Sequence, residues 1–167
     1  MRTLAVALLL VPRLAAAQAA PRSIAVETGW TLDPPAGSRG RVPVALAATW
    51  WIVGDLDVGA RVAWAFAAEP EVRGADGVIE AGLGLRQGVA RWSALRLLLV
   101  ADVTGVRHLG DGGTTSAPGL RVAAGPALEA FVGRDLSLSV AAERGVLLGT
   151  ASGGEGTSAT VRAAAYF

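Results

Sequence analysis

Apolar and polar residues alternate with a period of two from about residue 23 to the last residue, and clusters of Gly, Pro, Asp and Ser interrupt the alternation. This pattern is typical of β-strands joined by turns. Hydrophobic residues make up 52% of the 167 residues. The sequence nevertheless contains no run of about 18 apolar residues that would cross a membrane as a helix. A strongly apolar chain made of strands predicts a single β-barrel domain.

Eight strands are predicted, and the connections between them alternate in length. The predicted strands cover 23–32, 42–53, 56–66, 78–87, 92–107, 120–132, a seventh that begins at 136, and 159–167. Short connections fall at 54–55, 88–91 and 133–134, and longer ones at 33–40, 68–77, 109–118 and 150–157. Short periplasmic turns opposite longer extracellular loops are typical of transmembrane barrels. Pro126 counts against the sixth strand unless a bulge accommodates it.

The first residues are typical of a secretory signal peptide. Arg2 supplies positive charge, residues 4–11 are apolar, and residues 15–19 are mostly alanine. We expect a signal peptide over 1–19 and an outer-membrane barrel over 20–167, with cleavage after Ala17 as the second choice. Arg13 is atypical for such a segment, and an N-terminal core helix is the alternative. Removing Arg2 and Arg13 from a net charge of +1 leaves a nearly neutral chain, which predicts no nucleic-acid binding.

The alternation fits two opposite barrels, one soluble with a polar exterior and one in a membrane with an apolar exterior. On the polar face, six acids and five arginines are interleaved with many glycines and alanines. This favours a narrow interior in which charges pair, because small residues make room for large ones there. The charges either plug the lumen or line a water-filled path, and eight strands favour the plug. The predicted lumen charge network consists of Glu27, Asp57, Arg61, Glu80, Arg86, Arg96, Asp102, Arg121, Glu129, Glu143 and Arg162.

The aromatic residues fall at the ends of the predicted strands. Aromatic rings with a polar tip prefer the two interfaces of a membrane, so this placement favours a membrane barrel over a soluble one. The predicted aromatic girdle consists of Trp30, Trp50, Trp51, Trp64, Phe66, Trp92 and Tyr166.

The last strand, residues 159–167, alternates apolar residues and ends in Phe167. In this it resembles the C-terminal strand of outer-membrane barrels, and the chain resembles the small eight-stranded barrels of the OmpA transmembrane domain and OmpX type. The resemblance implies an all-β, antiparallel, up-and-down transmembrane barrel in a Gram-negative outer membrane, surrounded by its lipid. It also implies that the barrel assembly machinery recognises Phe167 as an assembly signal. We further expect the protein to be a monomer.

Residues that would carry chemistry are few. His108 is the one histidine, with Asp111 and Ser116 in the same predicted loop, and the sequence has no cysteine. Loop spacing imposes no catalytic geometry, so we expect an exposed structural histidine, no cofactor and no metal. The predicted function is a non-enzymatic barrel that serves envelope structure or surface interaction through its extracellular loops. The alternatives are a lipid A-modifying enzyme and a secreted soluble barrel that holds an apolar ligand.

Overall fold

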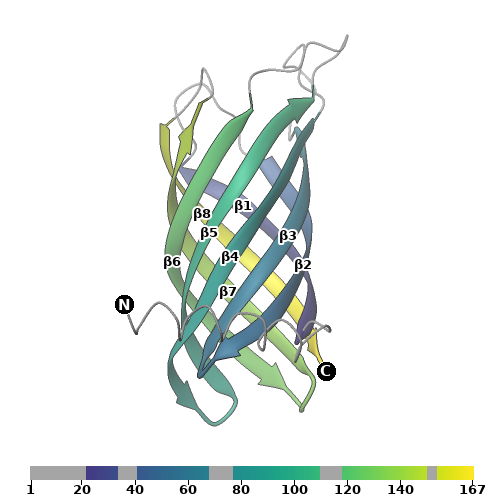
Figure 1. Ribbon diagram of the computed structural model, residues 1–167, viewed down its shortest axis with the longest axis vertical. Helices are drawn as coiled ribbons and strands as arrows, with labels where there is room; N and C mark the ends of the chain where they lie inside the picture. The colour runs from purple at the N-terminus through teal and green to yellow at the C-terminus, as the bar shows by residue number, and fades with distance from the viewer. Residues whose placement is uncertain (1–21, 34–40, 68–76, 110–117, 150–153) are drawn as a thin grey trace, which may run out of the picture.

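The structure, a computed structural model, describes residues 22–33, 41–67, 77–109, 118–149 and 154–167. In these ranges the chain forms eight antiparallel strands closed into a barrel (Figure 1). The strands are β1 (Ser23–Asp33), β2 (Arg41–Val53), β3 (Leu56–Ala67), β4 (Gly77–Trp92), β5 (Leu95–Leu109), β6 (Gly119–Val132), β7 (Leu136–Leu148) and β8 (Gly154–Tyr166). Each strand pairs with its neighbours in sequence, and β1 pairs with β8. The predicted fold class is confirmed.

Two strands extend five residues beyond one of their predicted bounds, and β5 begins at Leu95 instead of at the predicted residue 92. β4 continues to Trp92 through residues predicted to form a turn, because a register shift between Gly88 and Ala90 keeps it paired with β5. The turn lies instead at 93–94, where Ser93 has a φ of 50°. β8 begins at Gly154 inside the predicted loop, with Gly154 opposite Leu147 of β7. Glycine has a low strand propensity, but pairing with neighbouring strands overrides it here.

β6 passes Pro126 without a bulge, although Pro126 counted against this strand in the absence of one. Pro126 lies opposite Leu99 of β5 in unshifted register, while pairing with β7 is interrupted between Ala124 and Ala127. A Cβ on Gly125 would contact the carbonyl oxygen of Ala142 more closely than real Cβ atoms come. Glycine therefore lets the backbones of β6 and β7 approach each other at the point where proline donates no hydrogen bond.

Large apolar side chains cover the outside of the barrel. Leu46 of β2 and Leu83 of β4, for example, are 65% and 63% exposed. By contrast Ala45, which precedes Leu46, and Ala63 of β3 point inward and are buried. The interior apolar contacts form small clusters, of which Leu98, Val100 and Ala127 make up one. This distribution is the reverse of the one in soluble proteins and is typical of transmembrane barrels.

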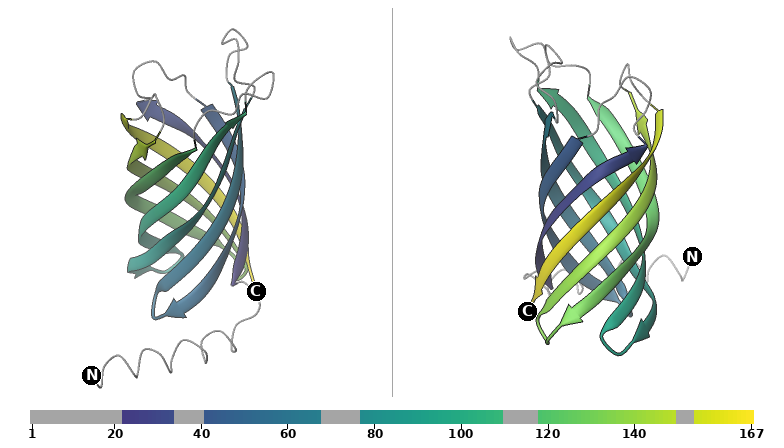
Figure 2. Two further views of the ribbon diagram at one scale, coloured as in Figure 1. Left: turned by 45° about the horizontal axis from the view of Figure 1, so that its top comes forward. Right: turned by 180° about the vertical axis from the view of Figure 1, so that it is seen from behind.

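The two ends of the barrel differ. The turns at 54–55, 93–94 and 133–135 lie at the end where Ser23 is opposite Tyr166. We call this the turn end, and the opposite end the loop end. Figure 2 shows from behind how β8 lies between β7 and β1 and completes the wall. Because the pairing register fixes how far each strand is shifted relative to its neighbours, each inward-facing side chain lies at a definite height in the lumen.

Candidate functional site: the charged lumen

All eleven predicted network residues belong to ion pairs inside the barrel. The N–O distances of these pairs range from 2.9 to 3.8 Å. The side chains form three groups along the barrel axis. The base cluster comprises Arg22, Asp57, Arg86, Arg96, Glu129 and Tyr166. The middle cluster comprises Glu27, Arg61, Glu80 and Arg162. The loop-end cluster comprises Asp102, Arg121 and Glu143.

Glu129 is the centre of the base cluster, and its side chain is fully buried. Ser137 Oγ and Tyr166 Oη donate hydrogen bonds to its Oε1 atom at 2.8 and 2.7 Å. Arg86 Nη2 lies 3.6 Å from Oε1, and Arg96 Nη1 lies 3.6 Å from Oε2. A carboxylate at this depth is stable only when it is paired and hydrogen-bonded. Glu129 therefore joins β6 to side chains of four other strands across the base of the lumen.

Asp57 is the second buried carboxylate of the base cluster. Its Oδ1 atom accepts a hydrogen bond from Arg22 Nη1 at 2.9 Å, and Arg96 Nη1 lies 3.5 Å from its Oδ2 atom. Arg96 also donates to the backbone oxygen of Asp55 at 2.9 Å. Arg22 is absent from the predicted network because it precedes the first predicted strand. The unequal count of six acids and five arginines was the available signal, and Arg22 makes the two counts equal.

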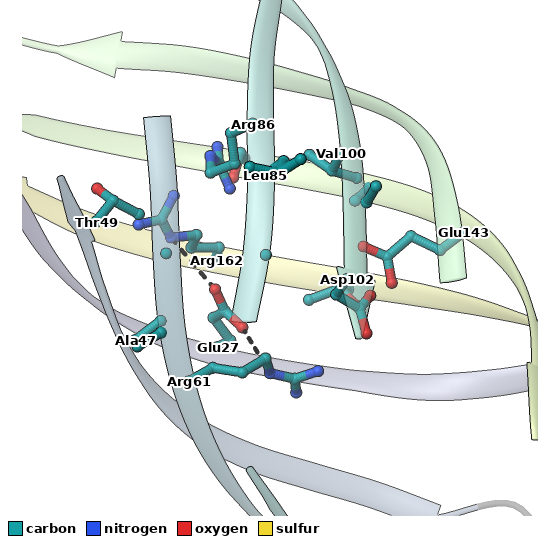
Figure 3. A pocket seen from close by; sticks show the side chains of 17 residues that line it. Glu27, Ala47, Thr49, Arg61, Leu85, Arg86, Val100, Asp102, Glu143 and Arg162 are labelled. Atoms are coloured by element: carbon teal, nitrogen blue, oxygen red, sulfur yellow. Dashed lines mark ion pairs between the residues drawn. The ribbon is translucent and has the colours of Figure 1, made fainter. Parts of the chain in front are cut away.

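Glu27 lies between two arginines in the middle cluster. Its carboxylate is 3.3 Å from Arg162 Nε and 3.5 Å from Arg61 Nε, the two pairs dashed in Figure 3. Arg61 Nη1 lies 3.8 Å from Glu80, and Arg162 Nη2 donates to Ser23 Oγ at 3.2 Å. This cluster therefore links β1 with β3, β4 and β8.

In the loop-end cluster, two carboxylates share one arginine. Arg121 Nη1 is 3.4 Å from Asp102, and its Nη2 atom is 3.2 Å from Glu143 and 3.0 Å from Ser158 Oγ. Thr104 Oγ1 donates a hydrogen bond to Asp102 at 2.8 Å. Negative charge is therefore in excess in this cluster.

A cavity of about 80 Å³ lies among the three clusters (Figure 3). Its charged lining comprises Glu27, Arg61, Arg86, Asp102, Glu143 and Arg162. A cavity of this size has room for a small number of water molecules, which the charged side chains of its lining can bind. The lumen therefore consists of paired side chains around a small cavity lined by charged and apolar groups.

The aromatic girdle prediction is wrong for Tyr166. This side chain faces the lumen with Arg162, because its hydroxyl bonds Glu129 and its ring lies 5.6 Å from that of Phe131. Trp51 shares the inward register of Thr49, but a register shift beside the turn leaves it exposed, with Nε1 donating to Gly54 O at 2.7 Å. Of the other girdle residues, Trp30, Trp64 and Trp92 are exposed on the outer wall. Trp50 is half-buried, and the side chain of Phe66 lies outside the described residues.

Phe167 follows β8 and is exposed. His108 belongs to β5 and not to the predicted loop, because its backbone pairs opposite Val78. Asp111 and Ser116 lie outside the described residues.

In the five described ranges, no group of three or more His, Cys, Asp or Glu residues is arranged to hold a metal ion. No helix in those ranges is long and apolar enough to cross a membrane.

An apolar outer wall around paired charges defines this chain as an eight-stranded transmembrane β-barrel. Its structure is similar to that of Neisserial surface protein A (NspA), with a TM-score of 0.71 and 14% identity over 87% of this chain and 96% of that one. It is also similar to the N-terminal β-barrel domain of Pseudomonas aeruginosa OprF, with a TM-score of 0.58 and 8% identity over 86% and 98% of the two chains. At these identities the likeness concerns the fold alone. No protein-family model matches the sequence, and a search of curated proteins gives no match.

Proposed function

We propose that this protein is a non-enzymatic outer-membrane barrel of a Gram-negative bacterium, with a plugged lumen and extracellular loops that serve envelope structure or surface interaction. The base cluster is the observation that supports the plugged lumen. Arg96 forms ion pairs with both Asp57 and Glu129, and the side chains of all three residues are at most 3% exposed. Because an eight-stranded interior is only wide enough for side chains, an ion would have to separate these pairs to pass.

The outer wall supports a position in lipid. A closed barrel pairs its backbone polar groups between strands, which a lipid environment requires. Leu46, Leu83 and their outward-facing neighbours would otherwise expose an extensive apolar surface to water. The proposal includes export by a signal peptide over 1–19, recognition of Phe167 by the barrel assembly machinery, and a monomer surrounded by outer-membrane lipid.

Fractionation of a Gram-negative host that expresses the full chain tests the location and the class. We expect the protein in the outer membrane, with different gel mobilities before and after boiling. A soluble periplasmic or extracellular protein would contradict the proposal. Mass spectrometry of lipid A from the same cells should match an empty-vector strain, whereas a new lipid A mass would favour an enzyme.

Conductance across planar lipid bilayers tests the plug. The wild-type barrel should give no steady conductance, and Arg96→Ala should introduce one, because Arg96 bridges Asp57 and Glu129. Arg144→Ala is the matched control, since Arg144 pairs with Glu155 on the outer wall at 2.6 Å with both side chains exposed. Steady conductance through the wild-type barrel would refute the plug.

A further inference from the structure

Four nitrogen atoms of the arginines around the lumen cavity have no hydrogen-bond partner among the described residues. They are Arg61 Nε, Arg86 Nη2, and Arg162 Nε and Nη1. The first two and Arg162 Nε each lie 3.3 to 3.6 Å from a carboxylate oxygen in an ion pair. The side chain of Arg162 is only 3% exposed. Buried N–H donors are normally satisfied, so Arg162 Nη1, which has neither a hydrogen bond nor an ion pair described above, indicates an acceptor in the cavity.

The arginines on this side of the cavity also share their carboxylates. Among the described residues, Arg86 pairs only with Glu129, which also serves Arg96. Arg162 pairs only with Glu27, which also serves Arg61. Arg61 and Arg96 each have a further carboxylate within 4.0 Å, but Arg86 and Arg162 do not. Positive charge is therefore incompletely balanced where these two arginines meet.

The excess negative charge of the loop-end cluster lies on the opposite wall of the cavity from these two arginines. Asp102 and Glu143 are both held by Arg121 in the loop-end cluster. Figure 3 shows Arg86 and Arg162 entering the same space from β4 and β8, with Asp102 and Glu143 on the other side. The guanidinium groups of Arg86 and Arg162 both carry positive charge and line the same cavity, so each disfavours the other. A negative ion between them would reduce this repulsion.

We propose that the cavity binds one small monovalent anion of the halide class between Arg86 and Arg162. A volume of about 80 Å³ admits a halide with little accompanying water. A spherical ion accepts N–H hydrogen bonds from any direction, so it satisfies Arg162 Nη1 and lies beside the guanidinium group of Arg86 without a fixed orientation. The ion acts as a structural counter-ion inside the barrel, and its site depends on the lumen geometry, whether or not the barrel conducts.

Anomalous diffraction from crystals soaked in sodium bromide locates such an ion directly. We expect a bromide peak within hydrogen-bond distance of the guanidinium groups of Arg86 and Arg162. Crystals of Arg162→Gln should lack the peak, and crystals of Arg144→Gln, altered at the exposed pair on the outer wall, should retain it. Wild-type crystals with an ordered lumen and no bromide peak would overturn the proposal.

Unfolding kinetics in lipid vesicles give a second measurement. Sodium chloride should slow unfolding relative to sodium gluconate at equal ionic strength, because gluconate is too large for the cavity. By mass action the slowing reaches about tenfold when chloride is present at roughly nine times its Kd. Arg162→Gln should remove the difference, and Arg144→Gln should keep it. If Arg162→Gln does not fold, the wild-type comparison decides, and equal rates in the two salts refute the anion site while leaving the plug intact.

Discussion

Replacing Glu129 with glutamine tests whether the base cluster stabilises the barrel through charge pairing. The amide keeps a carbonyl oxygen for Ser137 and Tyr166 but loses the negative charge, which leaves Arg86 without a carboxylate among the described residues. Removing one partner of a buried ion pair costs about 3–5 kcal/mol. We expect about 3 kcal/mol, the lower end of that range, because Arg86 is 13% exposed and lines the cavity.

Urea unfolding in phospholipid vesicles, followed by tryptophan fluorescence, measures this loss. The chain has five tryptophans, and Trp30, Trp64 and Trp92 are exposed on the outer wall, where emission reports transfer from lipid to water. The control is Arg144→Gln, which removes an ion pair whose side chains are 76% and 63% exposed. An exposed pair contributes less than about 1 kcal/mol, so this variant should unfold nearly as the wild type does.

A double variant separates pairing from loss of packing. Arg86→Gln combined with Glu129→Gln removes both charges, so the stability lost in Glu129→Gln should be partly recovered. Stabilisation by charge pairing is refuted if Glu129→Gln loses no more stability than Arg144→Gln, or if the double variant shows simple addition of the two single losses.

Three further substitutions test the wall of the barrel and the turn between β4 and β5. Leu83→Arg places a charge near the middle of β4 on the outer wall and should destabilise the protein by about 2–4 kcal/mol in vesicles; an unchanged urea midpoint would contradict lipid contact. Gly125→Ala should cost about 2 kcal/mol or more in the same assay, because its Cβ meets the Ala142 carbonyl oxygen. Gly105→Ala, where the nearest atom lies at an ordinary 3.6 Å, serves as its control and should change little. Ser93→Gly should raise the urea midpoint by an amount equivalent to about 1 kcal/mol, because Ser93 has a positive φ, and a lowered midpoint would refute this explanation.

The strands and the direction of their side chains were predictable because period-two alternation is a local property. Glu27, Arg96 and Arg162 each lie on the polar face of their strand in the alternating pattern. In the structure each of them forms an ion pair inside the barrel. The same alternation places Tyr166 on the inward face of β8, which it shares with Arg162. The sequence therefore already contained the evidence against assigning Tyr166 to the girdle. Aromatic character at a strand end does not by itself determine which face a residue occupies.

The partners of the charges were not predictable. The ion pair between Arg61 and Glu27 joins β3 to β1 across β2, and its formation depends on strand tilt and register, which no single strand encodes. The extension of β4 through the bulge at Gly88 and the pairing of β8 from Gly154 also depend on neighbouring strands. Local composition indicated a turn or loop at both places, and pairing with adjacent strands prevailed over it.

The pairing of Ser23 with Tyr166 limits the order in which the barrel forms. The hairpins from β2 to β7 contain only local pairings, but the sheet has two open edges until β8 reaches β1. Contacts between such distant segments form slowly, because loop closure must precede them. Open edges beside an apolar wall favour aggregation. We therefore expect newly exported chains to need protection until the last strand is in place, and a chain truncated within β8 to be degraded or aggregate instead of accumulating as a shorter barrel.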